Sequence, residues 1–359
     1  MKKAKKKVTG VRKRTRTIYV GKVPVGGGNP IVVQSMTKTD TVDVKSTVKQ
    51  IKFLESTGCE IIRLAVPNME AAKVLGFIKK SITIPMIADI HFDWRLALEA
   101  IKQGVDGLRI NPGNIGAKWK VREVVAAAKD KGIPMRIGVN AGSLERELLK
   151  KYGHPKPEAL VESAERHIQM LEEMDFTNLK VSLKGSDVPT TVKAYRLFSK
   201  KYDYPLHIGI SEAGPPSTGI IKSSVGCGIL LSEGIGDTIR VSLTAEPEEE
   251  VRVAYEILKS LGLRKKGVEI ISCPTCGRCG IDLRGLATEV ELRLREIDKP
   301  MKIAVMGCVV NGPGEAREAD LGIAGGKGIG ILFRKGKIIK KIKEKELLDE
   351  LMNEISSWR

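Results

Sequence analysis

The sequence predicts a parallel (β/α)8 barrel, the TIM-barrel fold, followed by a smaller α+β domain. Eight short apolar strands alternate with helices between residues 31 and 261, and these strands lack the strict alternation of a sheet with one wet face. A charged, glycine-flanked linker then ends this alternation of strands and helices. No G-x-G-x-x-G motif follows the first strand, which disfavours an open doubly wound sheet. A chain of 359 residues is long enough for one large and one small domain.

The elements of the barrel follow one another in a fixed order. A short hairpin around Gly21 precedes the first barrel strand. The expected strands are 31–35, 61–65, 85–89, 107–110, 135–139, 179–183, 206–210 and 238–243. The expected helices, which show apolar residues at helical spacing, are 44–57, 69–80, 93–103, 117–131, 156–174, 188–200, 217–232 and 248–261.

The pattern changes after residue 262. Strands are expected at 268–272 and 301–306, strand-like segments near 320–324, 329–333 and 337–342, and helices at 282–296 and 344–356. This order indicates a compact α+β domain with a mostly antiparallel sheet. The expected organisation is a basic tail at 1–16, the barrel at 17–262, a linker at 263–267 and the second domain at 268–359.

The net charge of +18 is unevenly distributed, because nine of the cations lie in the first sixteen residues, which contain no acid. This tail is expected to be a solvated arm. Aromatic residues make up only 4%, too few for the stacking used by single-strand binders, so no nucleic-acid partner is expected. The remaining charge suits an anionic small molecule or an acidic protein. No apolar stretch approaches the roughly 18 residues of a membrane span, and we expect a cytoplasmic protein without membrane contact.

Polar side chains occur at the carboxyl ends of the predicted barrel strands, where barrel enzymes place their active sites. In strand order they are Gln34, Thr37, Arg63, Asp89, His91, Arg109, Asn111, Arg136, Asn140, Lys184, Glu212 and Ser242. Three arginines and a lysine from four strands would meet at one mouth. Because the arginine fork pairs bidentately with phosphate oxygens, the cluster predicts a phosphate or diphosphate site.

The other ionisable groups near this mouth have less certain roles. Glu212 and Asp89 could act in acid–base chemistry or orient the cations, and His91 could donate a proton. The residues alone do not separate these roles. His154 and His167 are expected to be ordinary surface residues.

Four of the six cysteines lie in the last quarter of the chain, namely Cys273, Cys276, Cys279 and Cys308. A C-x2-C pair in a chain of this length favours thiolate metal ligands over disulfides. Zinc and an iron–sulfur cluster both remain possible, although a zinc ribbon more often ends in a second C-x2-C pair.

Other groups near these cysteines bear on the choice of metal. Glu315 could complete an incomplete thiolate set with a replaceable oxygen ligand. Cys279 is expected to be an accessory thiol or no ligand, because no C-x3-C-P continuation follows it. Cys59 and Cys227 are expected to be small core residues.

A set of long motifs resembles one known family. They are VQSMT, ADIHF, LRINPGNIG, RIGVNAGSL, VSLKGSD, SEAG, RVSLT, SCPTCGR and MGCVVNGPGEAREAD, in this order between about residues 16 and 356. The sequence closely resembles the bacterial 4-hydroxy-3-methylbut-2-enyl diphosphate synthase family, called IspG or GcpE, of the non-mevalonate isoprenoid route. No motif position departs from the family pattern.

The resemblance implies an oxidoreductase that opens and dehydrates 2-C-methyl-D-erythritol 2,4-cyclodiphosphate, with two electrons entering and water leaving. It implies a 4Fe-4S cluster held by Cys273, Cys276, Cys308 and Glu315. It also implies a substrate site made by Arg63, Arg109, Asn111, Arg136, Asn140, Lys184 and Ser242. Glu212, Asp89, His91 and Glu315 would lie near the reacting atoms, and Glu212 is our choice for handling the proton.

The resemblance also implies partners. The electron donor would be ferredoxin or flavodoxin, and two copies would form a head-to-tail homodimer in which the cluster domain of one faces the barrel of the other. The chain resembles the compact bacterial form, without the extra inserted domain of plant homologues. The alternative is a phosphate-binding barrel lyase or aldolase with a structural zinc domain.

Overall fold

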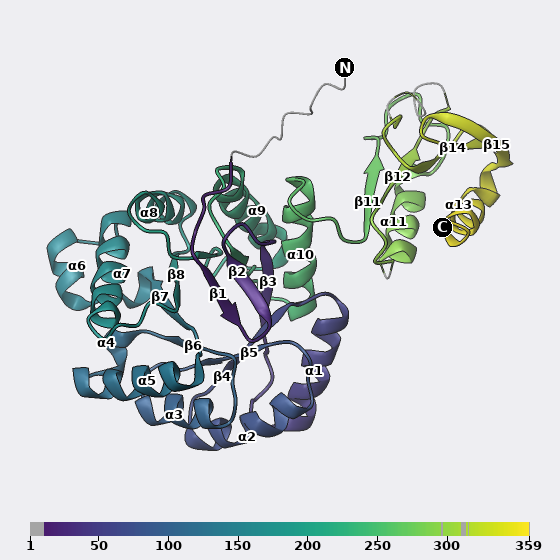
Figure 1. The fold of residues 1–359 in the computed structure, drawn as a ribbon. Helices are drawn as coiled ribbons and strands as arrows, with labels where there is room; N and C mark the ends of the chain where they lie inside the picture. The colour runs from purple at the N-terminus through teal and green to yellow at the C-terminus, as the bar shows by residue number, and fades with distance from the viewer. Residues whose placement is uncertain (1–10, 296, 310–313, 315, 359) are drawn as a thin grey trace. The chain divides into compact units, whose positions relative to one another are not determined.

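The computed structural model describes residues 11–358 except 296, 310–313 and 315. The chain divides into two compact units, Met1–Arg264 and Lys265–Arg359, which are described separately below (Figure 1). Within the described part of the chain, no helix is both long and apolar enough to cross a membrane. Glu315, an expected cluster ligand, lies outside the described residues.

The first unit is a barrel of eight parallel strands, as predicted. The strands are β3 (Val32–Met36), β4 (Ile61–Ala65), β5 (Met86–Asp89), β6 (Gly107–Ile110), β7 (Met135–Asn140), β8 (Leu179–Lys184), β9 (His207–Ile208) and β10 (Thr238–Ile239). Their order in the sheet is β8-β7-β6-β5-β4-β3-β10-β9, and a parallel bridge between Val181 and Leu206 joins the two ends.

Strands β9 and β10 are shorter than the expected 206–210 and 238–243. Past their last paired residues the chain keeps single backbone hydrogen bonds, in which Arg240 N–H donates to Ile208 O at 3.1 Å and Ser211 N–H to Gly185 O at 3.1 Å. The backbone therefore continues towards the mouth without a regular ladder.

Ten helices cover the strands or lie in their loops (Figure 1). They are α1 (Val44–Ser56), α2 (Met69–Lys80), α3 (Trp94–Lys102), α4 (Pro112–Ile115), α5 (Lys118–Lys131), α6 (Arg146–Tyr152), α7 (Pro157–Glu172), α8 (Val188–Lys201), α9 (Pro216–Ser232) and α10 (Pro247–Ser260). Helices α4 and α6 and the 3-10 turn η1 (Ala141–Ser143) were not predicted. They are too short to show a helical period.

The strand sequences explain how charge reaches the barrel interior. In β4, Ile62 and Leu64 are fully buried in the apolar layer beneath the helices, whereas Arg63 between them lies on the opposite side of the strand. Successive strand residues point to opposite faces. A strand can therefore carry an apolar outer face and a charged inner one.

A hairpin closes the amino-terminal end of the barrel. It consists of β1 (Thr17–Val20) and β2 (Val23–Gly26), paired antiparallel around Gly21, whose φ of 55° is left-handed. Its buried side chains form one apolar cluster with residues at or near the starts of three barrel strands. The cluster contains Ile18, Val20, Val25, Val32, Ile61 and Ile87.

The last residues of the basic tail contact the barrel. The Arg12 guanidinium pairs with Asp237 at 2.9 Å, and Lys13 Nζ donates to Tyr202 O at 2.6 Å. Arg16 pairs with Asp203 through Nε at 3.0 Å. The expectation of a solvated arm is therefore wrong for Arg12, Lys13 and Arg16, because carboxylates and a backbone carbonyl of the barrel bind these cations.

The second unit has one five-stranded sheet. Its strands β11 (Val268–Ser272), β12 (Met301–Met306), β13 (Leu321–Ala324), β14 (Ile329–Arg334) and β15 (Lys337–Lys343) lie in this order. The pairs β11–β12 and β12–β13 are parallel, and β13–β14 and β14–β15 are antiparallel.

The expected mostly antiparallel sheet is therefore wrong, since half of the pairings are parallel. Helix α11 (Leu283–Leu294) connects β11 to β12, and a helical crossover makes two neighbouring strands parallel. Helix α13 (Leu347–Ser356) follows the 3-10 turn η2 (Glu344–Glu346) and packs on β13 and β14.

Candidate functional site

The interior of the barrel contains a cluster of buried cations. Arg63, Arg109, Arg136 and Lys184 are each at most 8% exposed, and the structure brings them together at the carboxyl half of the barrel. Two further cations that the sequence analysis did not select join them, namely Lys180, 2% exposed, and Arg240, whose side chain is 15% exposed. Lys180 could have been found from the sequence, because it lies on the same face of the strand LKVSLK as the selected Lys184.

Asp89 is the first buried carboxylate of this cluster. It lies 3.4 Å from Arg63 Nε, 3.1 Å from Arg109 Nη1 and 3.6 Å from His91 Nε2. Burial alone would raise the pKa of Asp89, but the Arg63 charge, the His91 hydrogen bond and the Arg109 charge together hold it far below its usual range. Asp89 is therefore a permanent anion that orients two arginines. It is not suited to donate a proton.

Glu250 is the second buried carboxylate and reaches the cluster from α10. It is 2% exposed, accepts from Leu243 N–H at 3.0 Å, and lies 3.3 Å from Lys38 Nζ and 3.7 Å from Arg240 Nη2. The sequence analysis missed Glu250, because it stands in an acidic run, Glu248–Glu250, at the start of a helix, where acids commonly favour the helix dipole.

The cluster has more positive than negative charge. Among the described residues, Arg136 Nε and Nη1, Lys180 Nζ and both amide atoms of Gln34 are buried without a hydrogen-bond partner. Burial, together with the neighbouring arginine charges, lowers the pKa values of Arg136 and Lys184 well below their usual ranges. Buried polar groups normally have partners, so this arrangement requires an anion or ordered water. The guanidinium nitrogens of Arg136 without a partner favour an oxyanion.

Two glycines leave room for these cations. A Cβ at Gly138 would lie 2.6 Å from Arg109 Nε, and a Cβ at Gly209 would lie 2.7 Å from Lys184 Nζ and 2.3 Å from Arg240 O. Any side chain at either position would displace a cation. Glycine on the inner face of β7, and just beyond β9, therefore helps to shape the site.

Lys180 lies in the barrel interior below this mouth. Burial, with the charges of Arg136 and Arg63, lowers the pKa of Lys180 from 10.5 to about 7. On the neighbouring strand, His207 is fully buried and its Nδ1 lies 2.6 Å from Thr238 Oγ1. Burial and the Lys184 charge lower the pKa of His207 well below its usual range. His207 is therefore neutral, and Lys180 is the group in this layer that titrates near neutral pH.

Lys180→Met is expected to stabilise the ligand-free protein near pH 7. The folded protein binds the Lys180 proton less tightly than the unfolded chain, so the penalty is full below pH 7 and disappears as pH rises to 10.5. At its largest it corresponds to roughly 5 kcal/mol, at about 1.4 kcal/mol per pKa unit. Urea unfolding at several pH values checks this. A gap between variant and wild type that does not shrink with rising pH would contradict it.

The other predicted mouth residues are placed as follows. Asn111 is buried, and its side chain accepts from Gly113 N–H at 3.1 Å at the start of α4. Asn140 ends β7, and Ser242, half-buried, follows β10. His91 has a side chain that is 54% exposed, beside Asp89.

Glu212 follows β9 in a left-handed conformation with φ of 52°, which is uncommon for a residue other than glycine. It is exposed, and within the described ranges its carboxylate has no recorded contact with the buried cations. Such backbone strain is concentrated at functional sites, which favours a role for Glu212.

His167 was expected at the surface, and that expectation is wrong. It is 3% exposed on α7, and its Nε2 lies 3.1 Å from Glu145 Oε1, which also accepts from Ser163 Oγ at 3.0 Å. A Cβ at Gly113 would lie 2.8 Å from His167 Nε2. His167 therefore packs under the loop that carries Asn111. His154 is exposed, as predicted.

The cysteines of the second unit lie at the carboxyl ends of two neighbouring parallel strands. Cys273 follows β11 and Cys308 follows Gly307 after β12. The Gly307 N–H donates to Cys273 Sγ at 3.3 Å, and a Cβ at Gly307 would lie 2.6 Å from Cys279 Sγ. Cys276 is exposed, and hydrogen bonds from the backbone and side chain of Arg278 lower the pKa of its thiol.

These thiols fit a soft metal or an iron–sulfur cluster, since thiolate ligands and a backbone N–H on sulfur are typical of such centres. In the described part of the chain, three or more ligand side chains are not gathered around one point. The remaining cysteines are core residues, as predicted: Cys59 and Cys227 are buried, and burial raises the pKa of each thiol to about 12.

Fold and site together define a class, a (β/α)8 barrel protein with a cluster of buried cations inside the barrel and a second unit that carries free cysteines. Two family models match the chain, the GcpE TIM-barrel domain over residues 15–255 and the GcpE protein C-terminal domain over residues 269–357. The chain therefore belongs to the GcpE family.

Named relatives cover nearly the whole chain. A 4-hydroxy-3-methylbut-2-en-1-yl diphosphate synthase (flavodoxin) of Thermodesulfovibrio yellowstonii is 68% identical over 96% of this chain and 99% of its own length. A protein of the same name from Geobacter sulfurreducens is 61% identical over 96% and 98%.

Solved structures show the barrel fold alone. Dihydropteroate synthase from Stenotrophomonas maltophilia has a TM-score of 0.51 and 12% identity, covering 69% of this chain and 97% of that one. The Yersinia pestis enzyme has a TM-score of 0.50 and 12% identity, over 68% and 98%.

Proposed function

We propose that this chain is a 4-hydroxy-3-methylbut-2-en-1-yl diphosphate synthase that takes electrons from flavodoxin, the activity that names its relatives. The observation that carries the proposal is the identity of 61–68% with such enzymes over 96% of the chain. The buried cation cluster supports it independently, because a cyclic diphosphate supplies the oxyanions that the orphaned arginine and lysine donors require.

In this proposal the barrel binds the substrate 2-C-methyl-D-erythritol 2,4-cyclodiphosphate. Arg63, Arg109, Arg136 and Lys184 hold its phosphates, with Asn111, Asn140 and Ser242 adding hydrogen bonds. The lowered pKa of Arg136 would return towards its usual range beside phosphate, so binding restores the charge that burial disfavours. Asp89 keeps Arg63 and Arg109 in place.

Proton handling is assigned to Glu212, with His91 beside the mouth. Glu212 is exposed before substrate binds, and its left-handed backbone fixes the direction in which the side chain leaves the chain. Asp89 matches the family position near the reacting atoms. Its strongly lowered pKa favours an electrostatic role there over proton transfer.

The second unit would hold a 4Fe-4S cluster through Cys273, Cys276, Cys308 and Glu315, and when bound this group would pass electrons one at a time from the donor protein to the substrate. Gly307 supports the assignment, because its N–H already donates to the Cys273 sulfur. Two copies would assemble head to tail, so that the cysteines of one copy face the barrel mouth of the other.

Anaerobic turnover tests the proposal. The purified protein should be brown, contain about four irons per chain by the cluster's stoichiometry, and convert the cyclic diphosphate to the linear one with reduced flavodoxin, as followed by ³¹P NMR. A colourless protein with stoichiometric zinc and no conversion would instead support the rival barrel lyase with a structural zinc domain.

A further inference from the structure

The edge strand β15, together with Ile329 at the start of its neighbour β14, carries an exposed patch of apolar and basic residues. Ile329 is 60% exposed, Ile338 56% and Ile339 47%. Lys341 and Lys343 lie among them on the strand and are also exposed. These five residues are called the β15 patch. An edge strand needs charge to prevent aggregation, but it does not need exposed isoleucines. A mixed apolar and charged surface is typical of an interface.

Four of the five patch residues, Ile329, Ile338, Lys341 and Lys343, lie on the sheet face opposite α11 and α13. Lys341 pairs in register with Ile331, and Lys343 with Ile329. Cross-strand partners share a face. Ile331 packs on that face in the cluster of Ala304, Met306 and Phe333, away from the helix side. Lys340, by contrast, points to the helix side, where it pairs with Glu350 of α13 at 2.7 Å.

The surroundings of the patch are strongly positive. Residues 334–345 contain seven cations, namely Arg334, Lys335, Lys337, Lys340, Lys341, Lys343 and Lys345, and one acid, Glu344. Among the described residues Lys341 has no recorded ion pair, and Lys343 has only a loose one, 3.9 Å from Glu346. These charges remain available to a partner. A second copy of this chain, with a net charge of +18, is a poor match, whereas an acidic protein is a good one.

The patch begins next to the cysteine loops. The turn from β13 to β14 contacts both loops: a Cβ at Gly280 would lie 3.3 Å from Lys327 N, and a Cβ at Gly326 would lie 3.4 Å from Val309 Cγ1. Gly280 follows Cys279, and Val309 follows Cys308. The first patch residue, Ile329, comes directly after this turn.

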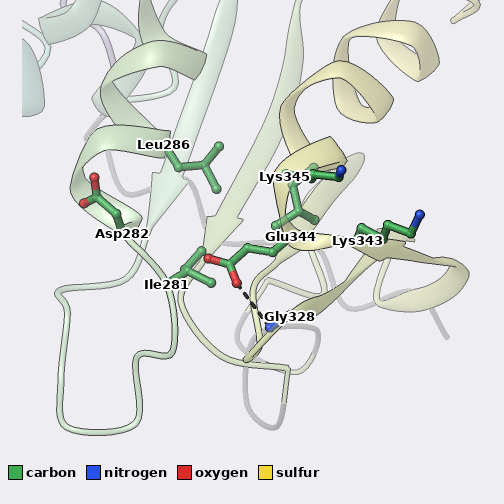
Figure 2. Close-up of a pocket in the computed structure, with 8 residues that line it drawn as sticks. Ile281, Asp282, Leu286, Gly328, Lys343, Glu344 and Lys345 are labelled. Atoms are coloured by element: carbon green, nitrogen blue, oxygen red, sulfur yellow. Dashed lines mark hydrogen bonds between the residues drawn. The ribbon is translucent and has the colours of Figure 1, made fainter.

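A cavity of about 480 Å³ lies on the other side of the same turn, between Ile281, Leu286 and Lys343. Figure 2 shows Glu344 reaching across it to Gly328, whose N–H donates to Glu344 Oε2 at 3.2 Å. Lys343 and Lys345 extend from the rim. The lysine-rich surface therefore continues around the turn that touches the cysteine loops.

We infer that the β15 patch is the docking surface for an acidic one-electron carrier protein that reduces the group held by the cysteines. The inference rests on the proposed function and names the contact through which its electron donor acts. Each docking event oxidises the carrier by one electron and reduces the cysteine-held group by one. Two events supply the two electrons that the substrate takes up. The substrate also takes up two protons and loses one water, when substrate and product are both written as fully protonated acids.

Charge reversal of Lys341 and Lys343 to glutamate tests the inference in the full-length holoenzyme. The probe is an acidic bacterial flavodoxin. Its affinity is measured by calorimetry in the oxidised form, and its KM is measured in turnover. We expect the affinity for flavodoxin to fall and its KM to rise, each by about tenfold or more, while turnover with reduced methyl viologen is unchanged. Wild-type binding should also weaken as ionic strength rises from about 0.05 to about 0.3 M.

The matched control is Lys49→Glu with Lys52→Glu, which changes the same charge on the exposed face of α1. It should leave flavodoxin affinity within about twofold, since exposed charges that make no contact with the partner are screened by salt and contribute little. Equal losses in the two variants would overturn the inference. So would unchanged binding in the β15 variant, or a change in its oligomeric mass, because a second copy would then cover the patch.

The two proposals fail in different ways. If wild-type holoenzyme turns over the cyclic diphosphate with neither donor, the proposed function fails, and the binding experiment still decides whether the patch docks the carrier. If methyl viologen supports turnover but flavodoxin binding does not depend on the charges of Lys341 and Lys343, the docking inference alone fails.

Discussion

Cys308→Ala is expected to abolish turnover with reduced flavodoxin and to lower the iron content of the anaerobically purified protein. Cys308 follows β12, beside Gly307, whose backbone already contacts the Cys273 sulfur. Removing one of three thiolates leaves an iron without a strong ligand, and cluster stability depends on the complete set. Iron analysis and the visible spectrum of the purified variant provide the measurement, with turnover as a second readout.

Cys59→Ala is the control for this experiment. Cys59 is 2% exposed in the barrel core, and burial raises the pKa of its thiol to about 12, so it is not suited to bind metal. The variant should lose roughly 1 kcal/mol of stability, the usual effect of a small core deletion, and keep its iron. Full iron content in Cys308→Ala would remove Cys308 from the ligand set.

Asp89→Asn is expected to lower the free energy of unfolding by about 3–5 kcal/mol, the usual effect of removing one partner from a buried ion pair. The substitution keeps the shape of the side chain but leaves Arg63 and Arg109 without their counter-charge. Because the folded-state pKa of Asp89 is lowered, its contribution is present above about pH 4 and declines as pH falls. Urea unfolding at pH 7 and in acid measures both effects.

Inorganic pyrophosphate should restore more stability to Asp89→Asn than to the wild type, since the variant has one more uncompensated buried cation. The surface control is Glu173→Gln, which breaks an ion pair with Lys118 whose side chains are 59% and 54% exposed. Its expected effect is about 0–1 kcal/mol. Equal losses for Asp89→Asn and Glu173→Gln would show that the barrel interior is hydrated and that its charges are screened.

The barrel could be predicted from the sequence because buried parallel strands are apolar runs at regular intervals. The parts that were missed are those without such a signal. Helices α4 and α6 have 4 and 7 residues, too few for a helical period. The parallel pairing of β11 with β12 depends on the path of α11, which no local pattern records.

The site was predictable where a cation interrupts an apolar strand, as Arg63 and Arg109 do. It was not predictable where the charge arrives from another element. Glu250 comes from a helix, and its role follows from contacts across the fold: it accepts from Leu243 N–H at 3.0 Å and pairs with Lys38 and Arg240. His167 was misjudged because its partly buried partner, Glu145, lies 22 residues away in the sequence and on a loop.

The β1–β2 hairpin covers the amino-terminal end of the barrel. There Ile18, Val20 and Val25 form an apolar layer, which disfavours the entry of ions from that end. The field of the buried cations therefore acts mainly through the opposite end, and an approaching anion is drawn towards the carboxyl ends of the strands. Loosening the hairpin would let water enter from the amino-terminal end and weaken that attraction without changing any residue of the site.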